Sequence, residues 1–248
     1  MSSHDLSSHP SVAIVTGASA GLGLALTRRL TEDGWHVVVD ARDGDRLAAA
    51  LHDLRPGSVT QVPGDVADAA HRAALVDAAV RAGGVDLLVN NASVIAGSPQ
   101  PRLDDLEAEA FTEVLAVNTV APHDLLRRAL PALSRAGGVV IDVSSDAAVE
   151  AYEGWGAYAA SKAALDQLSA VLAVEHPELS VYAVDPGDMA TDLHRRAVPD
   201  EDLADLPSPE SVVPALVHLL TVRPPSGRYR AADLPATSTQ GPTVGATR

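Results

Sequence analysis

The stretch SVAIVTGASAGLGLALTRRL, residues 11–30, decides the fold of this chain. It begins with the short apolar run Ser11–Thr16, which is typical of a strand buried on both faces of a parallel sheet. The glycine-rich turn Gly17–Gly23 follows, and leucines then recur at helical spacing up to Leu30. Glycines let a backbone approach a pyrophosphate closely, and a helix N-terminus supplies N–H donors. The stretch therefore predicts a strand, a phosphate-binding turn and a helix.

Strand and helix patterns alternate along the rest of the chain, which favours a single doubly wound parallel sheet of the α/β class, Rossmann-like, with helices on both faces. Expected strands cover residues 36–40, 58–62, 85–89, 138–143, 180–184 and 228–231. Expected helices cover residues 45–54, 69–81, 104–133 and 209–220, and another begins near Tyr158.

The chain divides into three predicted parts. Residues 11–234 form the catalytic domain, which includes a polar, proline-punctuated lid at 188–207. Residues 1–10 are expected to be a flexible N-terminus and residues 235–248 a disordered tail.

The composition of the chain excludes several classes of partner and site. The chain has 248 residues, 46% of them hydrophobic, with a formal net charge of −15 and no cysteine. Its length suits one full-sized domain, and its charge argues against nucleic acid and anionic membranes as partners. Without cysteine there is no disulfide, thiolate nucleophile or cysteine metal site, and no metal site is predicted. No secretory signal or membrane-spanning stretch is visible, so a cytoplasmic protein is expected.

Tyr158 and Lys162 form the most informative pair of side chains. They lie four residues apart at the head of an apolar helical pattern, so they occupy one helical face. A nearby cation favours the phenolate, so Lys162 is expected to lower the pKa of Tyr158. A helix with one exposed lysine and one half-buried tyrosine would give the same spacing. However, Lys162 is the only lysine in the chain, and arginine cannot replace lysine where the geometry demands a compact ammonium.

Polar residues follow several of the expected strands. Ligands bind doubly wound sheets at the carboxyl ends of the strands. The glycine turn, Arg42, Asn90, Ser145 and Gly187 all fall at such ends. We therefore expect these segments to surround one ligand site.

With these residues in view, the chain resembles the short-chain dehydrogenase/reductase family from about Ser11 to Arg230. The resemblance rests on motifs that occur in the family order: Thr16-Gly17-x3-Gly21-x-Gly23, Asp65-Val66, Asn90-Asn91-Ala92, Asn118, Ser145, Tyr158-x3-Lys162 and Pro186-Gly187-x3-Thr191. Two segments depart from the pattern: Ser93 stands where the family has glycine, and the last strand signature is reduced to residues 226–230.

The resemblance implies four catalytic residues. Tyr158 would protonate a carbonyl oxygen while a hydride arrives from a nicotinamide, and would act as the base in the reverse direction. Lys162 would lower the pKa of Tyr158 and hold ribose hydroxyls. Ser145 would bind the substrate oxygen. Asn118 would anchor a water that links Lys162 to solvent, although an asparagine inside a helix can also be satisfied locally.

The resemblance also implies a set of cofactor-binding residues along the expected ligand site. They are Gly17, Ser19, Ala20, Gly21, Leu22, Gly23, Arg42, Asp65, Val66, Asn91, Ala92, Tyr158, Lys162, Pro186, Gly187, Met189 and Thr191.

The end of the second expected strand bears on cofactor preference. An acid there suits the ribose hydroxyl of NAD(H), and an arginine suits the 2′-phosphate of NADP(H). In the family the acid falls at the position of Ala41, and Asp40, one residue earlier, should point away from the ribose. Arg42 matches the position of a basic residue in NADP-preferring relatives. We therefore expect NADP(H) to be favoured over NAD(H), although Ala20 replaces a second basic residue that many such relatives carry.

The sequence is compatible with several functions. The leading one is an oxidoreductase that interconverts a carbonyl and an alcohol, either NADP(H)-preferring or an NAD(H)-dependent alcohol dehydrogenase. A non-catalytic nucleotide sensor on the same fold and a lyase or epimerase using the same tyrosine are the alternatives. His194, Arg195 and Arg196 form either a solvated helix end or a cluster that steers an anionic substrate. The resemblance also implies a homodimer or homotetramer.

Overall fold

The structure is a computed structural model that describes residues 10–235. The expected flexible N-terminus (residues 1–10) and disordered tail (residues 235–248) lie outside this part except for residues 10 and 235. Within residues 10–235, no helix combines the length and the apolar character needed to cross a bilayer.

A seven-stranded sheet of order β3-β2-β1-β4-β5-β6-β7 forms the centre of the fold, and all its strand pairs are parallel. The order places β1 beside β4, where the winding of the chain reverses. The strands are β1 (Val12–Val15), β2 (His36–Val39), β3 (Val59–Gln61), β4 (Leu87–Asn90), β5 (Val139–Val143), β6 (Ser180–Asp185) and β7 (Gly227–Arg230).

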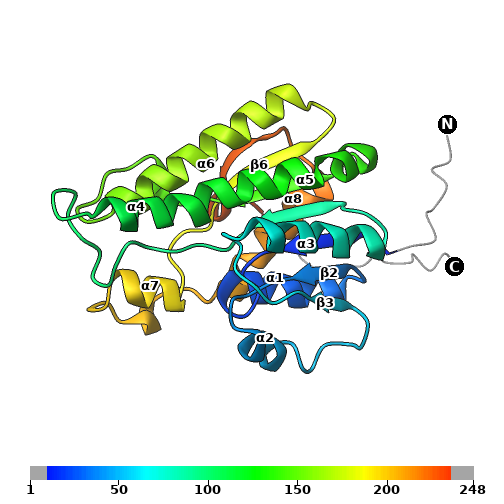
Figure 1. Ribbon diagram of the computed structural model, residues 1–248, viewed down its shortest axis with the longest axis horizontal. Helices are drawn as coiled ribbons and strands as arrows, with labels where there is room; N and C mark the ends of the chain where they lie inside the picture. The colour runs from blue at the N-terminus through cyan, green and yellow to red at the C-terminus, as the bar shows by residue number, and fades with distance from the viewer. Residues whose placement is uncertain (1–9, 236–248) are drawn as a thin grey trace, which may run out of the picture.

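Helices cover both faces of the sheet, as the sequence predicts (Figure 1). The α-helices are α1 (Gly21–Glu32), α2 (Gly44–Ala50), α3 (Ala69–Ala82), α4 (Ala108–Leu115), α5 (Ala121–Ala136), α6 (Gly156–Glu175), α7 (Asp192–Ala197) and α8 (Val213–Val222). Short 3-10 turns are η2 (Asp146–Ala148), η3 (Leu203–Asp205), η4 (Pro209–Ser211) and η5 (Ala231–Asp233), and the π-helical turn η1 covers Ala116–Val120.

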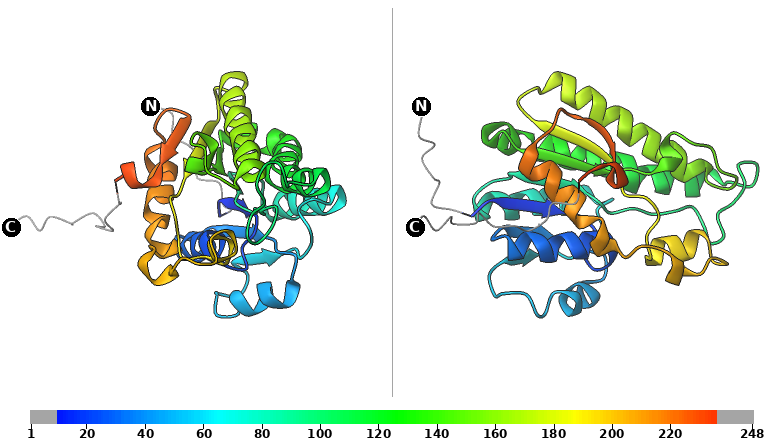
Figure 2. Two further views of the ribbon diagram at one scale, coloured as in Figure 1. Left: turned by 90° about the vertical axis from the view of Figure 1, so that its left-hand side faces the viewer. Right: turned by 180° about the vertical axis from the view of Figure 1, so that it is seen from behind.

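The alternation of side chains along β1 explains why the first apolar run is continuous. Ala13 and Val15 pack with α1 and α8 on one face, which Figure 2 shows from behind. Val12 and Ile14 pack with α3 and α5 on the other face. Because successive side chains of a strand point to opposite faces, a strand between two helical layers needs apolar residues at every position.

The helix expected at residues 104–133 is interrupted in the structure. It consists of α4, the π-helical turn η1 and α5. Asn118 lies in this turn and exchanges two hydrogen bonds with the backbone of Val94. A π-turn is a common local irregularity at functional sites, and here it coincides with the tertiary contacts of Asn118.

The expected lid contains more regular structure than a loop. Helix α7 and the turn η3 lie within residues 188–207. Thr191 caps α7, since its Oγ1 accepts a hydrogen bond of 3.2 Å from the backbone N–H of His194. The segment therefore includes a capped helix, and its mobility stays a prediction.

Candidate active site

A cavity of about 490 Å³ lies at the carboxyl ends of the strands. Nearly all of the predicted site residues line it, including Ser145, Tyr158 and Lys162. Three residues expected at the site, Gly23, Asn90 and Asn118, do not line it. The fold thus brings together residues that are up to 174 positions apart (Gly17 to Thr191) at one edge of the sheet.

The glycine turn is held by side chains from other strands. The Gly17 N–H donates a 2.7 Å hydrogen bond to Asp40 Oδ1, and Asn91 Nδ2 donates a 2.7 Å hydrogen bond to the carbonyl of Thr16. Gly17 and Gly21 have φ values of 70° and 56°, which favour glycine. Helix α1 begins at this turn without a side-chain cap, so its first N–H groups are available to an anion.

Gly23 serves the packing of the turn. A Cβ atom at this position would lie 2.4 Å from the carbonyl oxygen of Gly17 and 2.5 Å from Nδ2 of Asn91. Gly23 was expected to line the site, but it lies behind the residues that do so. The glycine is needed because the backbone of the turn and the Asn91 side chain fill this space.

Asp40 is buried at the end of β2, and both its carboxylate oxygens are engaged. Oδ1 accepts the hydrogen bond from Gly17, and Oδ2 lies 3.0 Å from Nε2 of His71. Arg42 is exposed, lines the same cavity, and has no hydrogen bond or ion pair with any other residue in the range 10–235. Asp40 is therefore occupied by contacts within the fold, whereas the guanidinium of Arg42 is free to bind a ligand.

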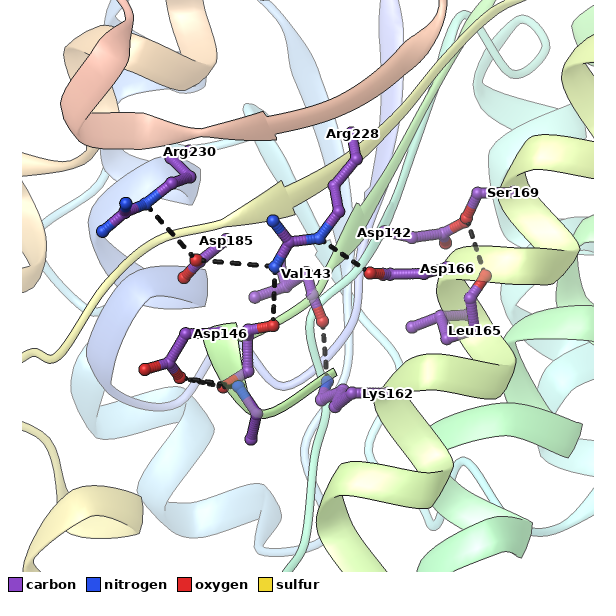
Figure 3. A network of polar contacts seen from close by, with 12 residues as sticks. Asp142, Val143, Asp146, Lys162, Leu165, Asp166, Ser169, Asp185, Arg228 and Arg230 are labelled. Atoms are coloured by element: carbon purple, nitrogen blue, oxygen red, sulfur yellow. Dashed lines mark hydrogen bonds and ion pairs between the residues drawn. The ribbon is translucent and has the colours of Figure 1, made fainter. Parts of the chain in front are cut away.

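Tyr158 and Lys162 lie on the same face of α6, as their spacing predicts. Tyr158 is 6% exposed and Lys162 is 1% exposed. The Nζ atom of Lys162 donates a 2.6 Å hydrogen bond to the carbonyl of Val143 at the end of β5 (Figure 3) and lies 5.5 Å from the centroid of the Tyr158 ring. The reading of Lys162 as an exposed lysine is therefore excluded by its burial.

The pKa of Tyr158 differs from the sequence expectation. Burial raises it to about 12, while the hydroxyls of Ser93 and Ser145 oppose the rise. The expected lowering by Lys162 is thus wrong for this arrangement, because removing a phenolate from water costs more than the neighbouring groups return. Burial also lowers the pKa of Lys162 to about 8, against the opposing charges of Asp142 and Asp166.

Both the side chain and the main-chain carbonyl of Ser145 form hydrogen bonds. Its hydroxyl donates a 2.9 Å hydrogen bond to Asp146 Oδ1, and its main-chain carbonyl accepts a 2.8 Å hydrogen bond from Nη2 of Arg228. Neither Asp146 nor Arg228 was expected at the site. Asp146 is adjacent to Ser145, so its position alone could have suggested it, whereas Arg228 reaches the site from the last strand, and no local motif points to it.

Asn118 is completely buried beneath the cavity. Its side chain accepts from the N–H of Val94 and donates to the carbonyl of Val94 and to Oγ of Ser161, at 2.9, 2.9 and 3.0 Å. The local satisfaction considered from the sequence is therefore present. The role of Asn118 as an anchor for a water stays a prediction.

Ser93 occupies its position without backbone strain. Arg223 alone among the non-glycine residues of the described chain has a positive φ, so the turn after β4 does not require the glycine of the family pattern. The Oγ atom of Ser93 is buried and has no hydrogen-bond partner of normal geometry within residues 10–235. It is one of the two hydroxyls that act on the pKa of Tyr158.

Two members of the basic cluster at residues 194–196 have acidic partners. Nε2 of His194 lies 2.5 Å from Glu201, and Arg195 pairs with Asp192 at 2.8 Å. Arg196 alone of the three has no ion pair within the described range. Asp192 also pairs with Arg46, at 2.5 Å, so one carboxylate serves two arginines, and the steering of an anionic substrate stays a prediction.

Comparison with known proteins agrees with this geometry. The model of the family described as short chain dehydrogenase matches residues 11–202. Dehydrogenase/reductase SDR family member 4 of Pongo abelii is 36% identical over 199 residues, which cover 77% of this chain and 70% of that protein. The chain belongs to the short-chain dehydrogenase/reductase family. As a member, it is an oxidoreductase whose cofactor is NAD(P).

Two solved structures of short-chain dehydrogenase/reductases show how far the similarity extends. An alcohol dehydrogenase from Thermococcus sibiricus, complexed with 5-hydroxy-NADP, is 27% identical with a TM-score of 0.80, over 90% of this chain and 96% of that one. A short-chain dehydrogenase from Streptomyces avermitilis is 26% identical with a TM-score of 0.80, over 92% and 91% of the two chains. Strand β7 pairs in parallel with β6 despite its reduced sequence signature.

Proposed function

We propose that this short-chain dehydrogenase/reductase is a carbonyl reductase that interconverts a ketone or aldehyde and an alcohol. The observation that carries the proposal is the convergence of Ser145, Tyr158 and Lys162 on the cavity that also contains the glycine turn. A non-catalytic nucleotide sensor would need only the turn. The buried ammonium of Lys162 has a cost in stability, which a role in binding or chemistry explains.

The residues present fit a dinucleotide cofactor. The first N–H groups of α1 and the turn Gly17–Gly23 would hold its pyrophosphate, since the helix has no side-chain cap. Arg42 would hold a 2′-phosphate. The remaining contacts follow the family: Ser19, Ala20, Leu22, Asp65, Val66, Asn91, Ala92, Pro186, Gly187, Met189 and Thr191 all line the same cavity. When bound, the cofactor supplies the hydride for reduction or accepts it for oxidation.

Tyr158, Ser145 and Lys162 would carry out the proton transfer. Burial raises the pKa of Tyr158 to about 12, which like the ordinary value of a tyrosine lies well above neutral pH, so the phenol carries the proton that it would donate to a carbonyl oxygen. Ser145 would exchange its present acceptor, Asp146, for the substrate oxygen and stabilise the charge that develops there. Lys162 would contact ribose hydroxyls and stabilise Tyr158 after the proton has left.

A spectrophotometric assay tests this function. NADPH oxidation at 340 nm would be followed with acetophenone, cyclohexanone, ethyl acetoacetate and 4-nitrobenzaldehyde as probe substrates. We expect turnover of at least one of these compounds. Tight NADPH binding with no turnover of any carbonyl or alcohol would instead favour the nucleotide sensor.

Arg42 is expected to set a preference for NADP(H). A bidentate guanidinium–phosphate contact should contribute about 1.5–3 kcal/mol, or about one to two decades in kcat/KM. Relatives with NADP-type ligands, such as the Thermococcus sibiricus enzyme, support this assignment. Measuring kcat/KM with both cofactors should show the preference in the parent and its loss in Arg42→Ala. Arg55→Ala, which removes an arginine outside the cavity, should retain it. A parent that prefers NADH, or an Arg42→Ala variant with unchanged discrimination, would contradict the assignment.

Cofactor affinity should weaken at alkaline pH. Burial lowers the pKa of Lys162 to about 8, so the side chain is charged below that pH and neutral above it. If the ammonium holds the ribose, the Kd for NADPH should be constant from pH 7 to 7.5 and rise by about tenfold by pH 9.5. Quenching of tryptophan fluorescence would report the Kd. A Lys162→Met variant should bind more weakly at pH 7 and show no alkaline rise; the same rise in both proteins would assign the titration to another group.

We further propose that the enzyme forms a homodimer or homotetramer through α5 and α6. Leu168, Val171 and Val174 are exposed apolar residues on α6, and exposed apolar residues on one helix are typical of a contact surface. Light scattering coupled to size-exclusion chromatography would give the assembly size.

A further inference from the structure

Arg228 links the last strand to the proposed catalytic residues. It lies on β7, at the edge of the sheet, and its guanidinium extends toward α6 (Figure 3). Its Nε atom donates a 2.9 Å hydrogen bond to Asp166 Oδ2, and Nη2 donates a 2.8 Å hydrogen bond to the main-chain carbonyl of Ser145. Nη2 also lies 3.5 Å from Asp185 at the end of β6. One guanidinium thus contacts residues of three segments that follow one another in the chain: Ser145 before η2, Asp166 on α6 and Asp185 on β6.

The two closest contacts involve the parts of the chain that carry the proposed chemistry. Ser145 directly precedes η2, and its hydroxyl faces the cavity region of Tyr158. Asp166 lies four residues after Lys162 on α6, so it is one helical turn further along the same face. A shift of Arg228 would therefore change the position of Ser145 relative to the helix that carries Tyr158 and Lys162.

This bridge differs from an ordinary surface ion pair. The side chains of Arg228 and Asp166 are 27% and 14% exposed, and the planar guanidinium fork presents separate edges to its two partners. Within the described chain, Asp166 forms its ion pair with Arg228 through Oδ2. The other carboxylate oxygen, Oδ1, is buried and has no hydrogen bond there. Arg230, two residues away on the same strand, is 65% exposed, and within residues 10–235 its only ion pair is with Asp185, at 3.9 Å.

We propose that Arg228 is a positioning residue of this enzyme: by holding the Ser145 carbonyl and Asp166 together, it fixes the distance between Ser145 and the Tyr158–Lys162 pair. The inference rests on the proposed function. Its physical basis is that a side chain with contacts on both sides removes a relative motion of two otherwise separate segments, and a small misplacement of reacting groups slows a proton and hydride transfer strongly.

Arg228→Ala and Arg230→Ala form a matched pair for the test. Both remove an arginine from β7, and both remove a positive charge near Asp185. Each purified full-length protein would be assayed with NADPH and the probe ketone that the parent turns over fastest. The measurements are Tm, the Kd for NADPH, and kcat and KM, the kinetics also in the presence of added methylguanidine.

We expect kcat of Arg228→Ala to fall by about 10- to 100-fold, with the Kd for NADPH within about threefold of the parent and the protein still folded at the assay temperature. Methylguanidine should restore part of kcat, because the bridge is partly open to solvent. Arg230→Ala should keep kcat within about twofold of the parent. A purely structural role would lower Tm without a rescue of kcat by methylguanidine.

If Arg228→Ala does not fold, Arg228→Lys and Arg230→Lys provide the comparison. A lysine keeps the charge but lacks the fork, so kcat should fall in Arg228→Lys alone. Equal kcat values in either matched pair would overturn the inference, as would a loss explained completely by NADPH binding or by the unfolded fraction. The parent separates this failure from that of the proposed function: an active parent with an unaffected Arg228 variant overturns the inference alone, whereas a parent without turnover overturns both.

Discussion

Replacing Tyr158 by Phe is expected to reduce kcat by about 10²- to 10⁴-fold and to leave NADPH binding nearly unchanged. The phenol is the only proposed proton donor among the residues that line the cavity, and its pKa, which burial raises to about 12, lies well above neutral pH. Phe preserves the ring, which packs edge-on against Trp155 at a centroid distance of 5.4 Å. The variant therefore isolates the proton transfer from the packing. Steady-state kinetics and a fluorescence Kd would measure both effects.

Tyr182→Phe is the matched control for this experiment. Tyr182 is buried in the sheet, lies outside the cavity, and donates its hydroxyl hydrogen bond to the carbonyl of Pro224. Losing that hydrogen bond should cost about 1 kcal/mol of stability with no change in kcat. A Tyr158→Phe variant that turns over like the control would remove Tyr158 from its proposed role.

The second large effect is expected from Lys162→Arg, which keeps the positive charge and changes its shape. Lys162 is 1% exposed, and its ammonium fits against the carbonyl of Val143 at 2.6 Å. A guanidinium is wider and planar, so it cannot occupy the same volume without displacing neighbours, which typically costs about 1–3 kcal/mol. We expect kcat/KM to fall at least about 100-fold.

Lys162→Met separates charge from shape at this position. It retains an unbranched side chain of similar length and removes the buried charge, so the protein should fold while kcat/KM falls as strongly as in Lys162→Arg. Thermal unfolding would establish that both variants are folded at the assay temperature. If Lys162→Arg is as active as the parent, the explanation of the single lysine by its compact ammonium is wrong.

Much of the fold was predictable because its signals are local. The apolar run of β1 needs only the alternation of side chains between two covered faces. The turn Gly17–Gly23 needs positive φ values and close backbone approach, both of which single glycines report. The interruption of the expected helix at Asn118 was not predictable, since the hydrogen bonds that accompany the π-turn come from Val94, which is distant in sequence.

Some features of the candidate site were likewise predictable from the sequence, and others were not. The spacing of Tyr158 and Lys162 indicates a shared helical face from the sequence alone. The direction of the Tyr158 pKa shift was not accessible, because it depends on how much water the surrounding segments exclude. The ion pair of Asp192 with Arg46 was also hidden, since the two residues are 146 positions apart in the chain.

The sequence by itself therefore determined the class of fold, the glycine-rich turn before α1 and the family of this protein, because these depend on periodicity, glycine positions and short spacings along the chain. Tertiary structure alone decided that Asp40 supports Gly17 while Arg42 stays free, that burial raises the pKa of Tyr158, and that Arg228 reaches Ser145 from 83 residues away. The physical reason is that desolvation and the pairing of charges depend on which distant segments pack together, and no local pattern records that.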